Sequence, residues 1–256
     1  MNKVVFKNVA KKFGDLVVLK DFDLSIKKGE SIVIIGGSGT GKSVSLKCLL
    51  GLLTPDSGSI TVDGKETVGI SDSERKDVNK NIGMLFQNGA LFDSMTVLEN
   101  ISFGLKSGQG MNDEDAHPIA YDCLDKVGLD KSVAEKYPSD LSGGMRKRVA
   151  LARAIAIKPE IILFDEPTTG LDPITASTID QLIIDTVRKM GATAIVITHD
   201  MASVRRVADR VALLYQGEIA WLGKVKEMDT TKNPYVKQFI SGSSEGPIAW
   251  AKTNKK

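Results

Sequence analysis

The chain has 256 residues, 42% of them hydrophobic and 26% charged, so it is long enough to bury the core of one globular domain with a smaller lobe. Its 34 basic and 32 acidic residues leave a formal net charge of only +2, which argues against a dedicated nucleic-acid binder, because such proteins usually carry a clear basic excess. No uncharged apolar run approaches the ~20 residues of a membrane helix. Any work at a membrane must therefore be done through a partner. The two cysteines, Cys48 and Cys123, lie far apart without a C-x-x-C motif, so we expect them to be buried packing residues rather than zinc ligands or a disulfide.

Short strands are expected at the start of the chain, over residues 4–10 and 16–26, with a turn at Gly14–Asp15 between them. The apolar, mostly β-branched run Ile32–Ile35 follows and predicts a strand buried on both faces. A helical pattern begins soon after this run and ends at Gly51.

A glycine-rich segment joins this strand to this helix and matches the pattern G-x-x-x-x-G-K-[ST]. Its glycines allow several backbone N–H groups to point into one cavity, and the following helix N-terminus adds roughly half a positive charge. We expect Lys42 to reach the β- and γ-phosphates of a nucleotide and the Ser43 hydroxyl to hold Mg²⁺. The expected nucleotide contacts are Gly36, Gly37, Ser38, Gly39, Thr40, Gly41, Lys42, Ser43 and Val44. By itself the loop leaves open a kinase, a GTPase, a helicase or a transporter motor.

The middle of the chain changes from strands to helices. A strand over 59–62, a capped helix opening at Ser71 and a buried strand over 82–86 come first, and the last of these ends at Gln87. From residue 88 to about 159 the pattern is helical: we expect a helix from Thr96 through Leu105, a glycine-rich break over 107–110, and two further helices capped by Asn112 and Ser142. This block predicts a helical insertion in an α/β chain.

Strand patterns return over residues 161–164, 194–198, 211–215 and 218–221. The first of them ends in Asp165 and Glu166. Paired acids also occur at solvated strand ends, but beside a phosphate loop we expect Asp165 to enter the Mg²⁺ shell and Glu166 to polarise water against the γ-phosphate. From residue 241 onward the chain is rich in glycine and serine and then basic, which is typical of a surface tail.

The segment Leu141–Met145 (LSGGM) is open to two interpretations. It is an ordinary helix cap, with Ser142 at the N-cap and small residues next. It is also suited to a second anion site, because Ser142, Gly143 and Gly144 offer a hydroxyl and free N–H groups with no side chains in the way.

Together these residues resemble the nucleotide-binding subunit of ABC transporters over nearly the whole chain. The resemblance implies a P-loop NTPase core with a mainly parallel sheet, an N-terminal antiparallel β subdomain and an inserted α-helical subdomain. It also implies one domain over residues 1–240, with the helical subdomain at about 88–159 and a tail over 241–256.

The resemblance implies ATP and Mg²⁺ as cofactors. It assigns ATP hydrolysis to Lys42, Gln87, Glu166 and His199, and the metal to Ser43, Gln87 and Asp165. Phe13 falls where the family stacks an aromatic ring on adenine, residues 142–144 are its signature, and Asp172 belongs to its D-loop. Met145 and Phe13 depart from the family's usual glutamine and tyrosine, which removes a side-chain hydrogen bond at each position but no hydrolytic group.

Family membership further implies a head-to-tail homodimer with two ATP molecules between the subunits. Three segments, FQNGALFDSMTVLENISF, LSGGMRKRVALARAIA and DEPTTGLDPITA, look like those of Mla/Mce-type lipid transporter ATPases. That similarity implies a peripheral subunit on the cytoplasmic face of the inner membrane, bound to an integral-membrane permease and to other Mla-type subunits. The expected activity is ATP-driven movement of phospholipid between inner and outer membranes, without nucleic acid.

An apolar seat for a permease helix is expected at Ala90, Leu91, Phe92 and Met95, although the same residues suit ordinary core between two lobes. The tail is expected to reach a neighbouring subunit. The rival functions are the ATPase of a small polar solute importer, a soluble ABC ATPase that acts outside transport, and a nucleotide-gated module without turnover.

Overall fold

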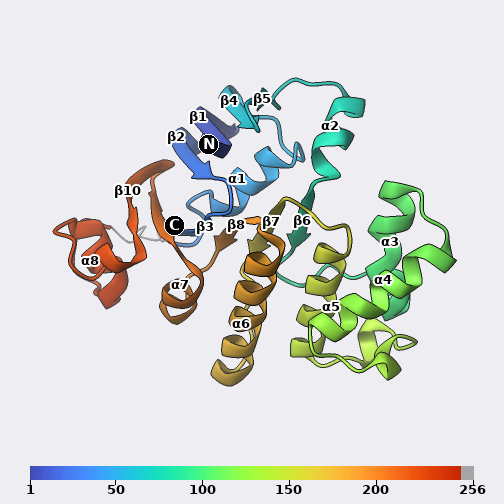
Figure 1. Cartoon of the computed structure of the whole chain (residues 1–256). Coiled ribbons are helices and arrows are strands. Elements are labelled where there is room, and N and C mark those ends of the chain that lie inside the picture. The colour runs from blue at the N-terminus through green and yellow to red at the C-terminus, as the bar shows by residue number, and fades with distance from the viewer. Residues whose placement is uncertain (249–256) are drawn as a thin grey trace.

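The structure, a computed structural model, describes residues 1–248 and has a ten-stranded sheet as its centre (Figure 1). The strands are β1 (Asn2–Phe13), β2 (Leu16–Lys27), β3 (Ser31–Ile35), β4 (Ser57–Val62), β5 (Lys65–Glu66), β6 (Ile82–Leu85), β7 (Ile161–Asp165), β8 (Thr193–Ile197), β9 (Arg210–Tyr215) and β10 (Glu218–Lys224). The helices are α1 (Lys42–Leu49), α2 (Asp72–Asn79), α3 (Val97–Gln109), α4 (Asp113–Lys126), α5 (Gly143–Ala156), α6 (Pro173–Met190), α7 (Met201–Val207) and α8 (Pro234–Ser241). Short 3₁₀ turns cover Lys131–Val133, Pro138–Asp140 and Val225–Glu227.

The sheet runs in the order β5-β4-β1-β2-β10-β9-β3-β8-β7-β6. Neighbours among β9, β3, β8, β7 and β6 are parallel, whereas β1, β2, β4 and β5 pair antiparallel. The fold class is therefore confirmed: a mainly parallel core, an N-terminal antiparallel part, and helices inserted between β6 and β7.

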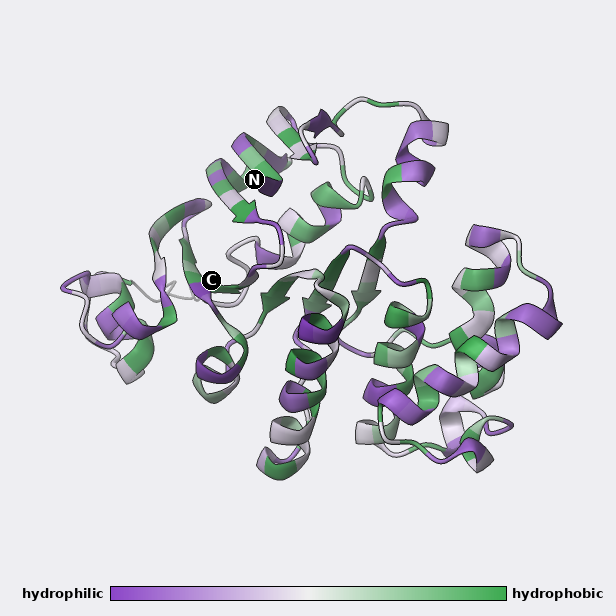
Figure 2. Ribbon diagram, in the orientation of Figure 1, coloured by the Kyte–Doolittle hydropathy of each residue, from purple (hydrophilic) through white to green (hydrophobic). Residues whose placement is uncertain are grey.

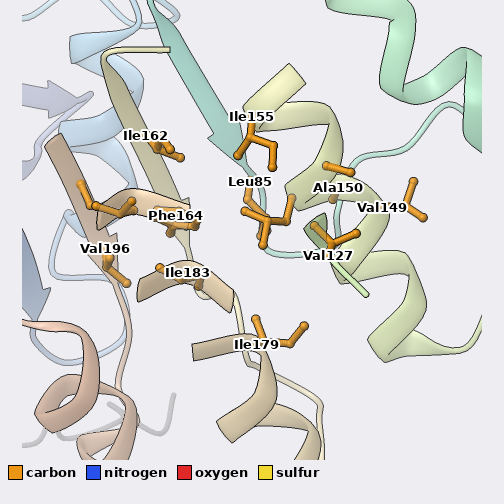
Figure 3. Packing of buried hydrophobic residues seen from close by; sticks show 14 of the residues in the cluster. Leu85, Val127, Val149, Ala150, Ile155, Ile162, Phe164, Ile179, Ile183 and Val196 are labelled. Carbon is orange, nitrogen blue, oxygen red and sulfur yellow. The ribbon is translucent and has the colours of Figure 1, made fainter. Parts of the chain in front are cut away.

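The parallel strands are buried on both faces, as their unbroken apolar sequences predict. Successive side chains alternate between two cores: Ile162 and Phe164 of β7 face α5 and α6, while Ile161 and Leu163 face α1 and the antiparallel strands. Figure 2 shows these central strands as hydrophobic. Figure 3 shows side chains of β6, β7, β8, α5 and α6 meeting in the first core, which fixes α5 against the sheet.

Helix α3 is longer than its sequence pattern indicates. Residues 107–109, expected as a break, continue the helix to Gln109, and Gly110 ends it with a left-handed backbone (φ 72°). The Gln109 amide donates to the Ile157 carbonyl at 3.2 Å. This tertiary hydrogen bond stabilises the last turn of α3 despite the weak helix propensity of Ser107 and Gly108. Strands β1 and β2 also extend beyond the expected 4–10 and 16–26.

The start of the expected tail folds back on its own chain. The Gln238 side chain is buried and donates from its amide to the carbonyls of Ser243 (3.3 Å) and Ile248 (3.2 Å), and it accepts from the Ile248 N–H at 2.7 Å. Residues 249–256 lie outside the described part of the chain, and the reach of the tail to a neighbouring subunit stays a prediction. Among residues 1–248, no helix combines the length and the apolar character that crossing a membrane requires.

Both cysteine thiols are buried, and this burial raises the pKa of Cys48 and of Cys123 to about 11. Because the thiolate is the reactive form, we expect each thiol of the native chain to react with iodoacetamide roughly 10²-fold more slowly than in the unfolded chain. Mass spectrometry of timed samples at pH 8, with and without denaturant, measures both rates. Rapid alkylation of either cysteine in the native chain would contradict the packing role.

Candidate active site

The phosphate loop bends between β3 and α1 in a conformation that requires glycine. Gly36 (φ 155°) and Gly41 (φ 103°) both have left-handed backbone. A Cβ at Gly36 would lie 2.5 Å from the Leu214 carbonyl oxygen, and one at Gly41 would lie 2.8 Å from that of Val18. The backbones of β9 and β2 therefore pack directly against the loop, and a side chain at Gly36 or Gly41 would displace it.

The Lys42 ammonium lies inside this loop. Its Nζ donates to the carbonyls of Gly36 and Gly37, both at 2.8 Å, and the side chain is 9% exposed. Burial lowers the pKa of Lys42, while the charges of Glu166 and Asp165 oppose that shift. A buried cation beside free backbone N–H groups is suited to a phosphate, which would supply the missing negative charge.

A hydroxyl and a carboxylate meet next to this lysine. Ser43 Oγ, in the first turn of α1, donates to Asp165 Oδ1 at the end of β7 over 3.0 Å. Burial raises the pKa of Asp165, and the hydrogen bond from Ser43 acts in the opposite direction. Such a pair fits Mg²⁺, which is commonly held by one or two carboxylates together with hydroxyl and phosphate oxygens.

Glu166 follows directly and is paired with His199. The distance from Glu166 Oε2 to His199 Nδ1 is 2.8 Å, and Thr169 Oγ1 donates to the same oxygen at 2.8 Å. The backbone of Glu166 is left-handed (φ 51°), and its N–H donates to the Ile197 carbonyl at 2.9 Å. The geometry thus joins two residues that the sequence separates by the whole of α6 and β8.

Gln87 reaches the site by its backbone, since its side chain is exposed. The Gln87 carbonyl accepts from the Lys147 ammonium, which also lies 3.4 Å from the Glu166 carbonyl. Lys147 was not predicted as a site residue, because a lysine in a basic run is typical of a solvated helix face. Its position three and four residues before the buried Ala150 and Leu151 is the signal that places it on the inner face of α5.

Phe13 is the last residue of β1, pairs with Leu16 of β2 beside the turn between them, and is half-exposed. Its ring centroid lies 5.6 Å from the Lys11 ammonium. Leu16 and Val17 are exposed beside it, and the next residue, Val18, touches the phosphate loop at Gly41. The turn therefore presents an apolar surface near the loop, suited to a flat ring.

The signature residues stand apart from the phosphate loop. Ser142 Oγ accepts from the Met145 N–H at 3.3 Å, and Ser142 and Gly143 are exposed at the start of α5. Asp172 caps α6 by accepting from the N–H groups of Ile174 and Thr175, both at 3.0 Å. A Cβ on Gly144 would lie 2.8 Å from Thr175 Cγ2, so the two helix starts touch. Within residues 1–248, no hydrogen bond joins this group to Lys42 or Ser43.

A protein-family model described as ABC transporter matches residues 19–169. The match spans the phosphate loop, Gln87, the segment 141–145 and both carboxylates. This chain belongs to the ABC transporter ATP-binding family. The cassette is accordingly an ATPase, and it binds ATP.

Three relatives of the cassette carry different printed names. Protein TRIGALACTOSYLDIACYLGLYCEROL 3, chloroplastic, of Arabidopsis thaliana is 42% identical over 95% of this chain and 75% of its own length. The intermembrane phospholipid transport system ATP-binding protein MlaF of Haemophilus influenzae is 37% identical, over 96% of this chain and 93% of its own. The L-cystine import ATP-binding protein TcyN of Bacillus subtilis is 41% identical, over 93% and 92%. The family is thus shared by proteins with different cargoes.

A solved ATP-binding cassette has the same fold. The dimeric post-hydrolysis state of that protein, bound to ADP and Pi, matches with a TM-score of 0.80 and 36% identity, over 87% of this chain and 98% of its own. It shows the products of ATP hydrolysis bound to a relative of this cassette.

We expect the Ser43→Ala variant of the cassette to need about tenfold more Mg²⁺ for half-maximal ATP hydrolysis, because it removes the hydroxyl beside Asp165. Ser45→Ala is the matched control, since the Ser45 hydroxyl donates to the Lys42 carbonyl on the opposite side of α1. Magnesium titrations of phosphate release measure both variants. An unchanged magnesium requirement in Ser43→Ala would exclude a metal role for this hydroxyl.

Proposed function

We propose that the cassette hydrolyses ATP at a site shared between two copies of the chain. The phosphate loop of one copy, with Lys42, holds the β- and γ-phosphates, and Phe13 stacks on adenine. Ser43 and Asp165 would hold Mg²⁺, with the exposed side chain of Gln87 as a further ligand, and the bound metal would neutralise charge on the transferred phosphoryl group. The fit of the site to these groups rests on the glycine cradle and on the Ser43–Asp165 pair.

Glu166 is the general base in this proposal. Its side chain is only 13% exposed and is held by His199 and Thr169 on the same oxygen. A carboxylate fixed in this way accepts the proton of the water that attacks the γ-phosphate, without first losing a full hydration shell. His199, with 64% of its side chain exposed, orients the carboxylate and is the proposed contact for the γ-phosphate.

The shared site follows from the separation of the two anion-binding groups. Ser142 and Gly143 are exposed at a helix N-terminus, and Gly143 and Gly144 lie against Leu171 and Thr175 at the start of α6 rather than against the phosphate loop. We infer that they bind the nucleotide held by a partner copy, head to tail. The dimeric state of the solved relative with ADP and Pi supports this arrangement.

The Glu166→Gln variant tests the assignment of the base. We expect ATP hydrolysis to fall by about 10²-fold or more, because the amide cannot accept the proton, while ATP and the dimer are retained. Phosphate release and size-exclusion chromatography with MgATP measure the two effects.

Glu218→Gln, at an exposed pair with Lys20, is the matched control and should behave as the unmodified chain. Hydrolysis at the normal rate in Glu166→Gln would contradict the role of this carboxylate.

We further propose that the cassette works beneath a membrane permease. An exposed aromatic pair lies where the sequence predicts the permease seat: the rings of Phe92 and Phe103 are 4.7 Å apart, and both are more than one-third exposed. A groove of about 490 Å³ between α2 and α3 adjoins it, lined by Phe103, Ile157, Arg75, Lys76 and Lys80 among others. This surface suits a short apolar helix that carries a carboxylate.

Phospholipid is the proposed cargo, moved between inner and outer membranes with Mla-type subunits on a permease. The support is the similarity to MlaF and to a chloroplast protein named for a diacylglycerol lipid, together with the three sequence segments. In this proposal residues 1–240 form the cassette, with its helical part at about 88–159, and act at the cytoplasmic face of the inner membrane, while residues 241–256 form an added tail. The similarity to TcyN makes an amino-acid importer the second candidate.

Purification of the tagged full chain from detergent-solubilised membranes tests the cargo and the seat together. We expect a permease with bound phospholipid, identified by mass spectrometry, and about tenfold less permease with Phe92→Ser, because a buried aromatic contact is lost. Leu222→Ser, an exposed apolar residue on β10 at the other end of the molecule, is the control (Figure 1). Recovery of a small-solute binding protein instead of lipid would favour the importer.

A further inference from the structure

Two basic side chains of α5 point toward the chain segment after β6 instead of into solvent. Lys147 is 6% exposed and binds the carbonyl of Gln87. Arg153, two turns further along, donates to the carbonyls of Gly89 and Ala90, each at 2.7 Å. Helix α5 therefore holds the segment 87–90 by its backbone, at two points.

The backbone held in this way is strained. Ala90 has φ 48° and Glu166 has φ 51°, a conformation that side chains with a Cβ rarely adopt. The carbonyl of Ala90 is fixed by Arg153, and the carbonyl of Glu166 lies 3.4 Å from the Lys147 ammonium. Such a backbone persists because its surroundings determine it. Here the cations of α5 contribute, together with the Ile197 carbonyl and the Thr169 N–H, which bind the backbone of Glu166.

The side chain of Lys147 is buried near the carboxylates of Glu166 and Asp165. Burial lowers the pKa of Lys147, and the carboxylates of Glu166 and Asp165 oppose the shift. In a buried site of low dielectric, an ammonium interacts more strongly with carbonyl dipoles than it does in water. This applies to the Glu166 carbonyl, at 3.4 Å, as well as to the Gln87 carbonyl. Removal of the Lys147 ammonium would leave buried carbonyls without this hydrogen-bond donor, which costs free energy in a site of low dielectric.

We propose that Lys147 is a positioning residue that ties the signature helix to the general base, an inference that rests on the proposed role of Glu166. One ammonium joins three elements: α5, the Gln87 segment and the turn after β7. Lys147 stands five residues after Ser142 on the same helix, so a displacement of α5 by a partner's nucleotide moves the backbone of Gln87 and Glu166. The occupation of one site thereby alters the geometry of the other.

The test compares Lys147→Met, which keeps the apolar stem and removes the donor, with Lys147→Arg, which keeps the donor and the charge. In the full chain we expect Lys147→Met to lower kcat for ATP by about 10-fold to 100-fold, because a misplaced base loses rate steeply. The KM for ATP stays within about threefold, since Lys42 and the loop are intact. Lys147→Arg recovers most of the lost kcat.

Arg148→Met is the matched control. Arg148 lies on the same helix and donates to the Gly128 carbonyl at 3.2 Å, away from the site. Its kcat and KM should equal those of the unmodified chain. Lys147→Gln, which keeps a single shorter donor, provides a second variant should Lys147→Met fail to fold, and we expect a kcat between those of the Met and Arg variants.

The proposal is overturned by an unchanged kcat in the folded Met or Gln variant, by a KM that rises as much as kcat falls, or by an equal loss in Arg148→Met. The double variant Lys147→Met with Glu166→Gln separates it from the proposed function: we expect it still to form the ATP-bound dimer. Normal hydrolysis by Glu166→Gln alone would refute the base itself, an outcome distinct from any failure of Lys147.

Discussion

The register of four neighbouring parallel strands determines where every reactive group of this cassette lies. Ile34 of β3 and Asp165 of β7 both pair with Ile197 of β8, and Leu85 of β6 pairs with Phe164. The carboxyl ends of the strands therefore stand at one level, with the phosphate loop, His199, the carboxylates and Gln87 following them. A slip of one residue in β7 would exchange its inward and outward side chains, and would remove Asp165 from Ser43.

The same sheet edge explains why, in the proposed mechanism, one chain supplies only half of each site. Lys42, Ser43 and the two carboxylates lie together beyond the ends of the parallel strands. The exposed N–H groups at the start of α5 lie apart from them, because the apolar core holds α5 against the sheet (Figure 3). A negatively charged nucleotide, bound between the phosphate loop of one copy and the start of α5 of a partner copy, would connect the two groups. In the proposed mechanism, closure of the dimer would depend on the γ-phosphate, and opening would follow its loss.

The sequence predicted what depends on local patterns. The glycine loop, the caps at Ser71, Asn112 and Ser142, and the buried strands depend on residues close together in the chain, and the structure confirms them. The extent of α3 was wrong because Gln109 is held by Ile157, far along the chain. The pairing of Glu166 with His199 depends on strand register, which no local pattern reveals. The spacing of Lys147 to Ala150 and Leu151 indicates its buried face, but its partners depend on how α5 packs.

Mixing two inactive variants tests the central claim that each reaction centre combines two chains. Lys42→Ala removes the phosphate-loop cation, and Ser142→Arg blocks the signature N-terminus, so neither homodimer has an intact site. In an equal mixture half of the dimers are mixed and each holds one intact site of two, which predicts roughly a quarter of the normal ATPase rate. A mixture that stays as inactive as its components would contradict the account.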